Sequence, residues 1–274
     1  MKRLLVTVAL ATLALPAFAA IQYEFIQKET SDDIVSPVTD FSARVTIDGL
    51  SSRIEFIGGT MYPPGAYAVS TDGSRRVLFV DPTKQWFTEV NASNVATALG
   101  ASNITIENLK STIATPPDRP TIAGIATDDH TRLTLTYDIS VVLRSIPMKL
   151  KVKTEIDTWS TWKYGDVLTN ALSSNIRTGN AQIDALLETE MTKMRGFPLR
   201  QLVNTQTIAD LPEMRSELKV PTTRTITREM EVTSVRETQA DPTMFMVPSG
   251  YSRADVPQTP KAATQVLTFD PPAK

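Results

Sequence analysis

The 274-residue sequence contains no cysteine and a single histidine, His130. The absence of cysteine excludes disulfides, cysteine nucleophiles, cysteine zinc ligands and the lipid-modified cysteine of a bacterial lipoprotein. A single histidine excludes any site that needs two histidines from this chain, and a Ser-His-Asp triad would have to use His130. The glycine-rich patterns of phosphate-binding loops are also absent. We therefore expect a protein that is not an enzyme and that carries no cofactor.

Long apolar runs are missing after the first twenty residues. The chain begins with Lys2 and Arg3, continues with a short apolar run at residues 4–15, and then reaches Ala-Phe-Ala at residues 17–19. This order is typical of a secretory signal peptide, whereas a membrane-spanning helix needs about 20 apolar residues. We expect a signal peptide over residues 1–19 that is cleaved near Ala19/Ala20, and a periplasmic mature chain without a transmembrane segment. An uncleaved anchor is the alternative.

Neither sign of charge dominates, because the chain has 28 basic and 30 acidic residues. A nearly balanced charge gives no electrostatic footprint for nucleic acid, so we expect no nucleic-acid partner.

The clearest positive feature is alternation between apolar and polar residues. The odd positions of residues 133–141 are apolar, and after residues 142–143 the phase changes, so that most even positions of residues 146–156 are apolar. A period of two predicts a strand with one buried and one solvated face. Two such runs in succession predict an antiparallel sheet with one face in water.

Turn signals divide the rest of the chain into further short elements. Asp48-Gly49 and Asp72-Gly73 predict two tight hairpins, since glycine adopts positive φ without a side-chain clash. Strand-like alternation also covers residues 21–28 and 222–237, whereas residues 91–99 and 183–194 have helical spacing. A segment near residues 245–251 looks like an anchor. We expect one α+β domain over residues 20–253, followed by a proline-rich mobile tail at residues 254–274.

The charged clusters favour structural over catalytic interpretations. Asp128 and Asp129 next to His130 invite a metal or catalytic site, but adjacent residues on a strand point to opposite faces. We therefore interpret this stretch as a solvated turn that enters a strand. The other carboxylate clusters, Asp32-Asp33 and Glu188 with Glu190, are interpreted as a solvated loop and a solvated helix face.

A basic row and several methionines leave two interpretations each. Lys149, Lys151 and Lys153 could meet anionic head groups or an acidic partner, but a solvated face that discourages edge aggregation is favoured. The methionines could adapt to an irregular ligand or simply fill the core, and the core is the default. They are Met191, Met194, Met230, Met244 and Met246.

Three stretches carry a resemblance to a known group of proteins. They are Asp-Pro-Thr-Lys-Gln-Trp at residues 81–86, Arg-Gly-Phe-Pro-Leu at residues 195–199, and Met-Phe-Met-Val-Pro-Ser-Gly-Tyr at residues 244–251. Their order along an exported, strand-rich chain resembles an uncharacterised exported family that is related to the LolA-like lipoprotein-carrier superfamily. The resemblance implies a curved antiparallel sheet, an incomplete β-barrel, with helices on its concave face and an apolar cavity for acyl chains.

These observations combine into one fold prediction and two functional hypotheses. The fold is an α+β, LolA-like incomplete barrel with helices packed on the concave face. The first hypothesis is a periplasmic carrier for a lipid or another apolar ligand, and the second is an envelope structural or protein-interaction domain with a filled core. The predicted ligand wall is Leu133, Leu135, Tyr137, Ile139, Met148, Leu150 and Val152. The predicted lid is Leu187, Met191, Met194 and Phe197, and no residue is assigned to a metal.

Overall fold

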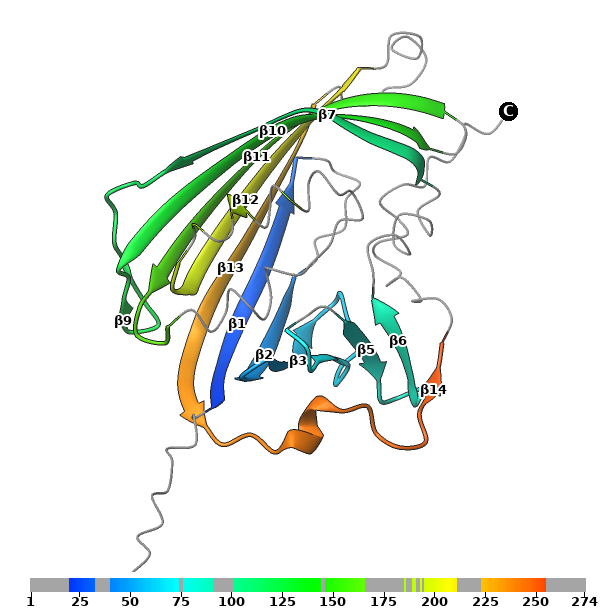
Figure 1. The fold of residues 1–274 in the computed structure, drawn as a ribbon, viewed down its shortest axis with the longest axis vertical. Helices are drawn as coiled ribbons and strands as arrows, with labels where there is room; N and C mark the ends of the chain where they lie inside the picture. The colour runs from blue at the N-terminus through cyan, green and yellow to red at the C-terminus, as the bar shows by residue number, and fades with distance from the viewer. Residues whose placement is uncertain are drawn as a thin grey trace, which may run out of the picture.

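One curved sheet accounts for most of the structure. The computed structural model describes residues 20–32, 40–73, 76–90, 101–143, 146–165, 185, 189–190, 193, 195–210 and 223–254. These residues form a 12-stranded sheet and a separate two-stranded hairpin (Figure 1). The one complete helical element among them is a turn of 3-10 helix, η2 (Pro242–Phe245). None of the described residues belongs to a helix long and apolar enough to cross a membrane.

The N-terminal half of the sheet is a meander of antiparallel neighbours. Its strands are β1 (Ala20–Ser31), β2 (Phe41–Asp48), β3 (Ser51–Gly59), β4 (Tyr67–Ser70), β5 (Val77–Asp81) and β6 (Trp86–Val90). Gly49 and Gly73 adopt φ values of 57° and 71° in the turns after β2 and β4. The two predicted hairpins are thus confirmed, because these turns use the positive φ that favours glycine.

The second half supplies the long strands of the sheet. They are β7 (Ala101–Ala114), β10 (Asp129–Leu143), β11 (Ile146–Thr161), β12 (Phe197–Asp210) and β13 (Thr223–Thr238), while β8 (Thr121–Ile122) and β9 (Ile125–Ala126) form the small hairpin. The final strand β14 (Ser252–Arg253) pairs in parallel with β6. The sheet order is β14-β6-β5-β4-β3-β2-β1-β13-β12-β11-β10-β7. The pairing of β13 with β1 therefore joins the two halves of the chain.

The two faces of the sheet differ in chemistry. We call the face that carries Tyr23, Val45 and Leu133 the inner face, and the face that carries Arg44 and Lys151 the outer face. Strand register connects these assignments, since paired residues on neighbouring strands share a face. Most inner positions are apolar and most outer positions are polar, as the alternation predicts.

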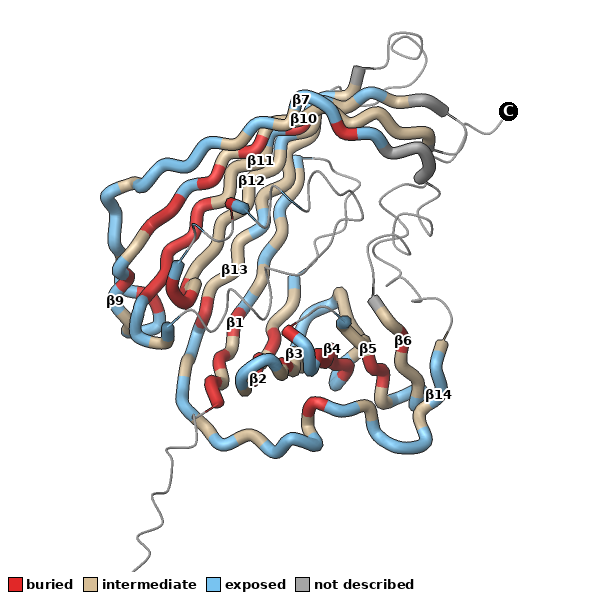
Figure 2. The backbone as a smooth tube through the Cα atoms, viewed as in Figure 1, coloured by how far each residue is buried: buried red, intermediate tan, exposed pale blue. Residues whose placement is uncertain are grey.

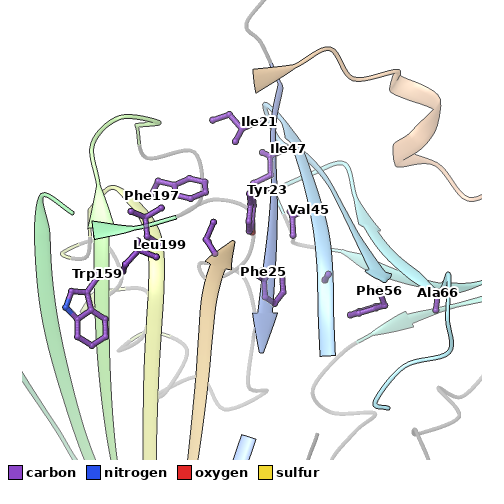
Figure 3. Close-up of a cluster of buried hydrophobic side chains, with 13 residues drawn as sticks. Ile21, Tyr23, Phe25, Val45, Ile47, Phe56, Ala66, Trp159, Phe197 and Leu199 are labelled. Carbon is purple, nitrogen blue, oxygen red and sulfur yellow. The ribbon is translucent and has the colours of Figure 1, made fainter. Parts of the chain in front are cut away.

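Burial along the inner face changes from one end of the strands to the other (Figure 2). At the packed end, which we define by Tyr23, Val45, Phe197, Leu199 and Val232, side chains are almost completely buried in the main core cluster (Figure 3). At the open end, most of the apolar side chains are half-buried, although Ile106 on β7 is 7% exposed. We define the open end by Tyr137, Ile139, Met148, Leu150 and Ile226. The same sheet thus presents a dry core and a partly exposed apolar surface.

The predicted α+β class is wrong for the described part of the chain. That part is nearly all β, and no helix in it packs on the concave face. The large curved antiparallel sheet itself is confirmed. The prediction assumed that a one-sided sheet needs helices as a cover, but at the packed end large side chains of the sheet form the core together with Ile122 of the β8–β9 hairpin. The predicted helix at residues 91–99 lies outside the described residues, and so does most of residues 183–194.

The C-terminal segment covers the outer face of the short strands. Phe245 of η2 is buried, and Val247 and Tyr251 pack on the cluster of Tyr67, Val69 and Val80. The guanidinium of Arg53 on β3 donates a 3.0 Å hydrogen bond from Nη1 to the carbonyl oxygen of Met244. The predicted anchoring segment is therefore confirmed. Beyond Ala254, the predicted mobile tail lies outside the described residues.

Candidate functional site

The predicted ligand wall forms two rows that face each other across β10 and β11. The register pairs Tyr137 with Val152, Ile139 with Leu150, and Val141 with Met148. Antiparallel partners lie on the same face, so the structure places the seven predicted wall residues side by side on the inner face. The wall continues onto β7, where Ile106 pairs with Ile139.

Exposure divides this wall into two parts. Leu133 and Leu135 are 0% and 6% exposed and form a small core cluster of their own, and Val152 is equally buried. The positions nearer the open end are half-buried, namely Tyr137, Ile139, Met148 and Leu150. Burial raises the pKa of the Tyr137 phenol, which the hydrogen bond with Thr154 partly offsets. Only the open part of the wall leaves apolar surface for another molecule.

One residue of the predicted lid region contacts the buried part of the wall. Glu190 is buried, and its Oε1 accepts hydrogen bonds from Ser111 Oγ on β7, at 3.2 Å, and from Lys193 Nζ, at 2.8 Å. Ser111 is the register partner of Leu135. The expectation that Glu190 lies on a solvated helix face is therefore wrong. The ion pair with Lys193 stabilises the carboxylate in this position.

The predicted lid itself is not assembled in the described residues. Leu187, Met191 and Met194 lie outside them. Phe197 is described, but it opens strand β12 at the packed end, where its ring meets Tyr23 edge-on at 5.3 Å and Tyr164 at 5.2 Å. Phe197 is 0% exposed and belongs to the core. It contributes to the core rather than to a movable cover.

A row of aromatic rings on the inner face was not anticipated as a unit. Successive ring centroids lie 3.8–6.2 Å apart through the N-terminal strands. The row comprises Tyr23, Phe25, Phe41, Phe56, Tyr62, Phe79 and Trp86. Most contacts are edge-on or tilted, which suits the ring quadrupoles and adds about 0.5–1.5 kcal/mol per pair. Strand alternation indicates the face of each ring on a strand, but only the strand order, with Tyr62 from the loop after β3, brings the rings together.

A charged pair lies between the aromatic row and the open wall. Arg228 on β13 bonds Glu29 on β1, with Nη2–Oε2 and Nε–Oε2 distances of 2.6 and 3.1 Å. The pKa of Tyr62 is raised by burial, and the positive charge of Arg228 partly opposes this shift. The inner face is therefore amphipathic rather than uniformly apolar.

His130 is buried, so its interpretation as part of a solvated turn is wrong. The side chain lies on β10 and is 1% exposed. Its Nδ1 lies 2.6 Å from Asp118 Oδ1, and its Nε2 lies 2.7 Å from Asp157 Oδ1. Both ring nitrogens are therefore engaged by carboxylates.

The remaining candidate clusters occupy the outer face or the strand ends. The exposed Lys151 and Lys153 line a 310 Å³ hollow on the outer face together with Lys110. Lys153 also pairs with Glu155 at 3.0 Å, as expected for a solvated charged face. Asp32 accepts a hydrogen bond from the amide of Thr225, whereas Asp33 and Glu188 lie outside the described residues. Within the described part of the chain, no group of three or more acidic or histidine side chains could hold a metal ion.

The comparisons with known proteins identify no family. No model of a known protein family matches the sequence, and no curated protein matches it. Among solved structures, the chain is similar to a LolA superfamily protein, NE2245 from Nitrosomonas europaea, with a TM-score of 0.30 and 8% identity, over 85% of this chain and 91% of that chain. It is also similar to PNGF-II, with a TM-score of 0.31 and 10% identity, over 89% of this chain but only 32% of that chain. Similarity at these TM-scores carries no functional argument.

Proposed function

We propose that this protein binds an apolar ligand, such as a lipid or an acyl chain, on the open end of its inner face. The observation that carries the proposal is the open part of the two registered rows on β10 and β11, where Tyr137, Ile139, Met148 and Leu150 remain half-buried. Covering such a surface is favourable, at about 0.8 kcal/mol for each ligand CH₂ removed from water. The proposed cargo agrees with what the resemblance to the LolA-like superfamily implies.

The proposed setting is the bacterial envelope. The first 19 residues have the order of a secretory signal peptide. A lipid carrier exported in this way would act in the periplasm. We assign no reaction to the protein.

A second candidate function is an envelope interaction domain without a ligand. The packed end favours an interaction domain. In the main cluster there, the protein itself buries the apolar side chains of the inner face, so that no ligand is needed. In that case the partner is an envelope protein. The two functions differ in what a purified sample contains.

The first test is native mass spectrometry of residues 20–274, purified from a bacterial envelope without detergent. We expect a reproducible additional mass that extracts into organic solvent and fragments as a lipid. A protein that remains free of ligand after incubation with phospholipid and fatty acid vesicles contradicts the carrier. Cross-linking to one envelope protein would then support the interaction domain.

A pair of variants locates the ligand on the inner face. Ile139→Arg places a charge in the half-buried row, whereas Ser140→Arg places the same charge on the outer face of the same strand. We expect only Ile139→Arg to lose the lipid. Leu135 is a poor choice for this test, because it is 6% exposed and a charge there disrupts the core. Equal retention of lipid by the two variants would remove this row from the proposed site.

A further inference from the structure

The surroundings of His130 form a balanced charge cluster on the outer face. Its register partner is Trp159, and the two rings stack at a centroid distance of 4.2 Å. The carboxylate of Asp157 meets His130 Nε2 and also accepts a 2.8 Å hydrogen bond from Nε of Arg132. Asp118 meets His130 Nδ1 and accepts a 2.9 Å hydrogen bond from Nε1 of Trp159. Two carboxylates thus face one guanidinium and one imidazole.

The protonation state of the imidazole decides whether each ring nitrogen can donate a hydrogen bond to the carboxylate that faces it. A neutral imidazole has one N–H and one lone pair, and only the imidazolium donates from both nitrogens. Two ionised carboxylates on opposite sides of the ring therefore require the protonated form. With the imidazolium, the charges of His130 and Arg132 balance those of Asp118 and Asp157. With the neutral ring, one lone pair of nitrogen faces a carboxylate oxygen.

The two carboxylates differ in what they can do when the proton leaves. The Asp157 side chain is buried and keeps its bond to Arg132. The Asp118 side chain is 57% exposed, so water can replace the histidine. When His130 loses a proton, its contact with Asp118 should therefore break, whereas its contact with Asp157 should remain.

Asp118 belongs to a segment that this contact fastens to the sheet. Residues 115–128 connect β7 to β10 and contain the small β8–β9 hairpin. Thr127 N and Oγ1 bond the carbonyl oxygen of Pro120, and Asp128 N bonds that of Ser160. Ile122 of the hairpin is buried in the main core cluster with Trp159. Asp118 is thus the only ionic contact from this segment to the buried histidine among the described residues.

We propose that His130 is a pH-sensitive latch, which holds residues 115–128 against β10 and β11 as an imidazolium and loosens them when it releases its proton to solvent. The inference is independent of the proposed apolar ligand. It depends on the geometry of Asp118, His130 and Asp157.

Other charged groups near the latch are already paired. Arg119 of the same segment bonds Asp129 of β10 at 3.4 Å, and Asp128 accepts hydrogen bonds from Thr161 and Trp162. From β12, Arg200 lies over the Trp159 ring and is paired with Glu229 and Glu231 of β13. None of these groups supplies a second proton donor to Asp118 in place of the histidine.

The latch has two limits in pH. The hydrogen bond from Trp159, followed by the hydrogen bond and charge of His130, lowers the pKa of Asp118 below its usual value. A lowered carboxylate pKa gives stability that is present above the ordinary value and is lost as the pH falls through the lowered one. The contribution of His130 depends on pH in the opposite direction, because the latch needs the protonated ring and is lost as the pH rises. The segment should therefore be held most firmly between these limits.

The single histidine makes the test specific. In ¹⁵N-labelled residues 20–274 without a histidine tag, the imidazole nitrogen signals arise from His130 alone. We expect both ring nitrogens to be protonated wherever residues 115–128 are protected from exchange. As the pH rises, the loss of the proton should coincide with about a tenfold or greater fall in amide-exchange protection of Thr127 and Asp128, the factor for one hydrogen bond to a charged group.

Two variants separate a latch from an ordinary structural contact. Asp118→Asn should shift the His130 titration to lower pH and abolish the pH dependence of protection in residues 115–128. Asp241→Asn is the control, because Asp241 also has a lowered pKa but caps η2, and it should leave His130 unchanged. A wild-type ring with one unprotonated nitrogen while residues 115–128 are still protected overturns the latch, and so does protection that is independent of the ring titration. If Asp118→Asn does not fold, the wild-type titration alone decides.

Discussion

The packed end and the open end of the inner face are built from the same strands, yet they differ in what covers them. At the packed end, Tyr23 and Phe197 are 2% and 0% exposed and contact each other edge-on. At the open end of the same sheet, Ile139 and Leu150 are register partners that remain half-buried. The alternation in sequence is the same in both places. An apolar stripe therefore indicates which face is turned inward, but not whether protein or ligand covers it.

The two ends also differ in the side chains that they use. The packed end and its aromatic row are rich in rings, which bury large areas and make specific edge-on contacts. The open end on β10 and β11 is mainly aliphatic, with Thr154 and Tyr137 as its polar points. Aliphatic surface without directional partners suits a ligand of variable shape, whereas the ring contacts suit a unique core. The comparison leads to four measurements.

The largest effect should come from truncating a ring at the packed end. We expect Phe197→Ala to lower the free energy of unfolding by about 3–5 kcal/mol, because it leaves a cavity in a fully buried cluster. Urea denaturation monitored by circular dichroism measures the loss. If Phe197→Ala costs no more than Ile139→Ala, the distinction between the two ends is wrong.

A backbone change at the packed end should have the next largest effect. Gly196 has a φ of 83°, and a Cβ there would lie 2.9 Å from the carbonyl oxygen of Thr161. We expect Gly196→Ala to cost about 2–3 kcal/mol, since an unfavourable φ is combined with a backbone clash. Gly49→Ala is the matched control, because Gly49 also has a positive φ but has open space around it. Equal losses in the two variants would mean that the close approach to Thr161 has no energetic weight.

At the open end, truncation should affect binding more than folding. We expect Ile139→Ala to cost about 1 kcal/mol of stability, below the usual range for a buried residue, because the side chain is only half-buried. The same variant should weaken binding of a fluorescent fatty acid, whereas Thr136→Ala on the outer face should not. Unchanged binding together with a large loss of stability would place Ile139 in an ordinary core.

Much of the sheet follows from the sequence, because its signals are local. The period of two and its change of phase near residues 142–143 predict β10 and β11, and Asp48-Gly49 predicts the β2–β3 turn. The predicted class is wrong for the described residues, because it assumes that helices must cover the apolar face of the sheet. Local patterns do not show that the curvature of the sheet lets side chains from its own strands bury one another at the packed end.

The contacts that define the sites are the least predictable from sequence, because they join distant residues. Asp118 and Asp157 lie 12 and 27 positions from His130 in sequence, on opposite sides of the ring. The rule that neighbours on a strand point to opposite faces correctly separated Asp129 from His130, but it said nothing of partners on other elements. The pairing of β13 with β1, which brings Arg228 to Glu29, is likewise set by the order of strands.

The smallest effect should arise on the outer face, directly behind the packed end. Arg44 lies between the buried Ala43 and Val45 on β2, but its side chain points outward and bonds Glu24 at 2.7 Å. We expect Arg44→Gln to cost about 0.5 kcal/mol, and less at high salt, because both side chains of the pair are substantially exposed. Denaturation at low and high salt measures this difference, with Val45→Ala as the inner-face neighbour that should cost several times more at either salt concentration. A large, salt-independent loss in Arg44→Gln would show that the outer face also contributes to the core, and the contrast between the two ends would then no longer be a property of the inner face alone.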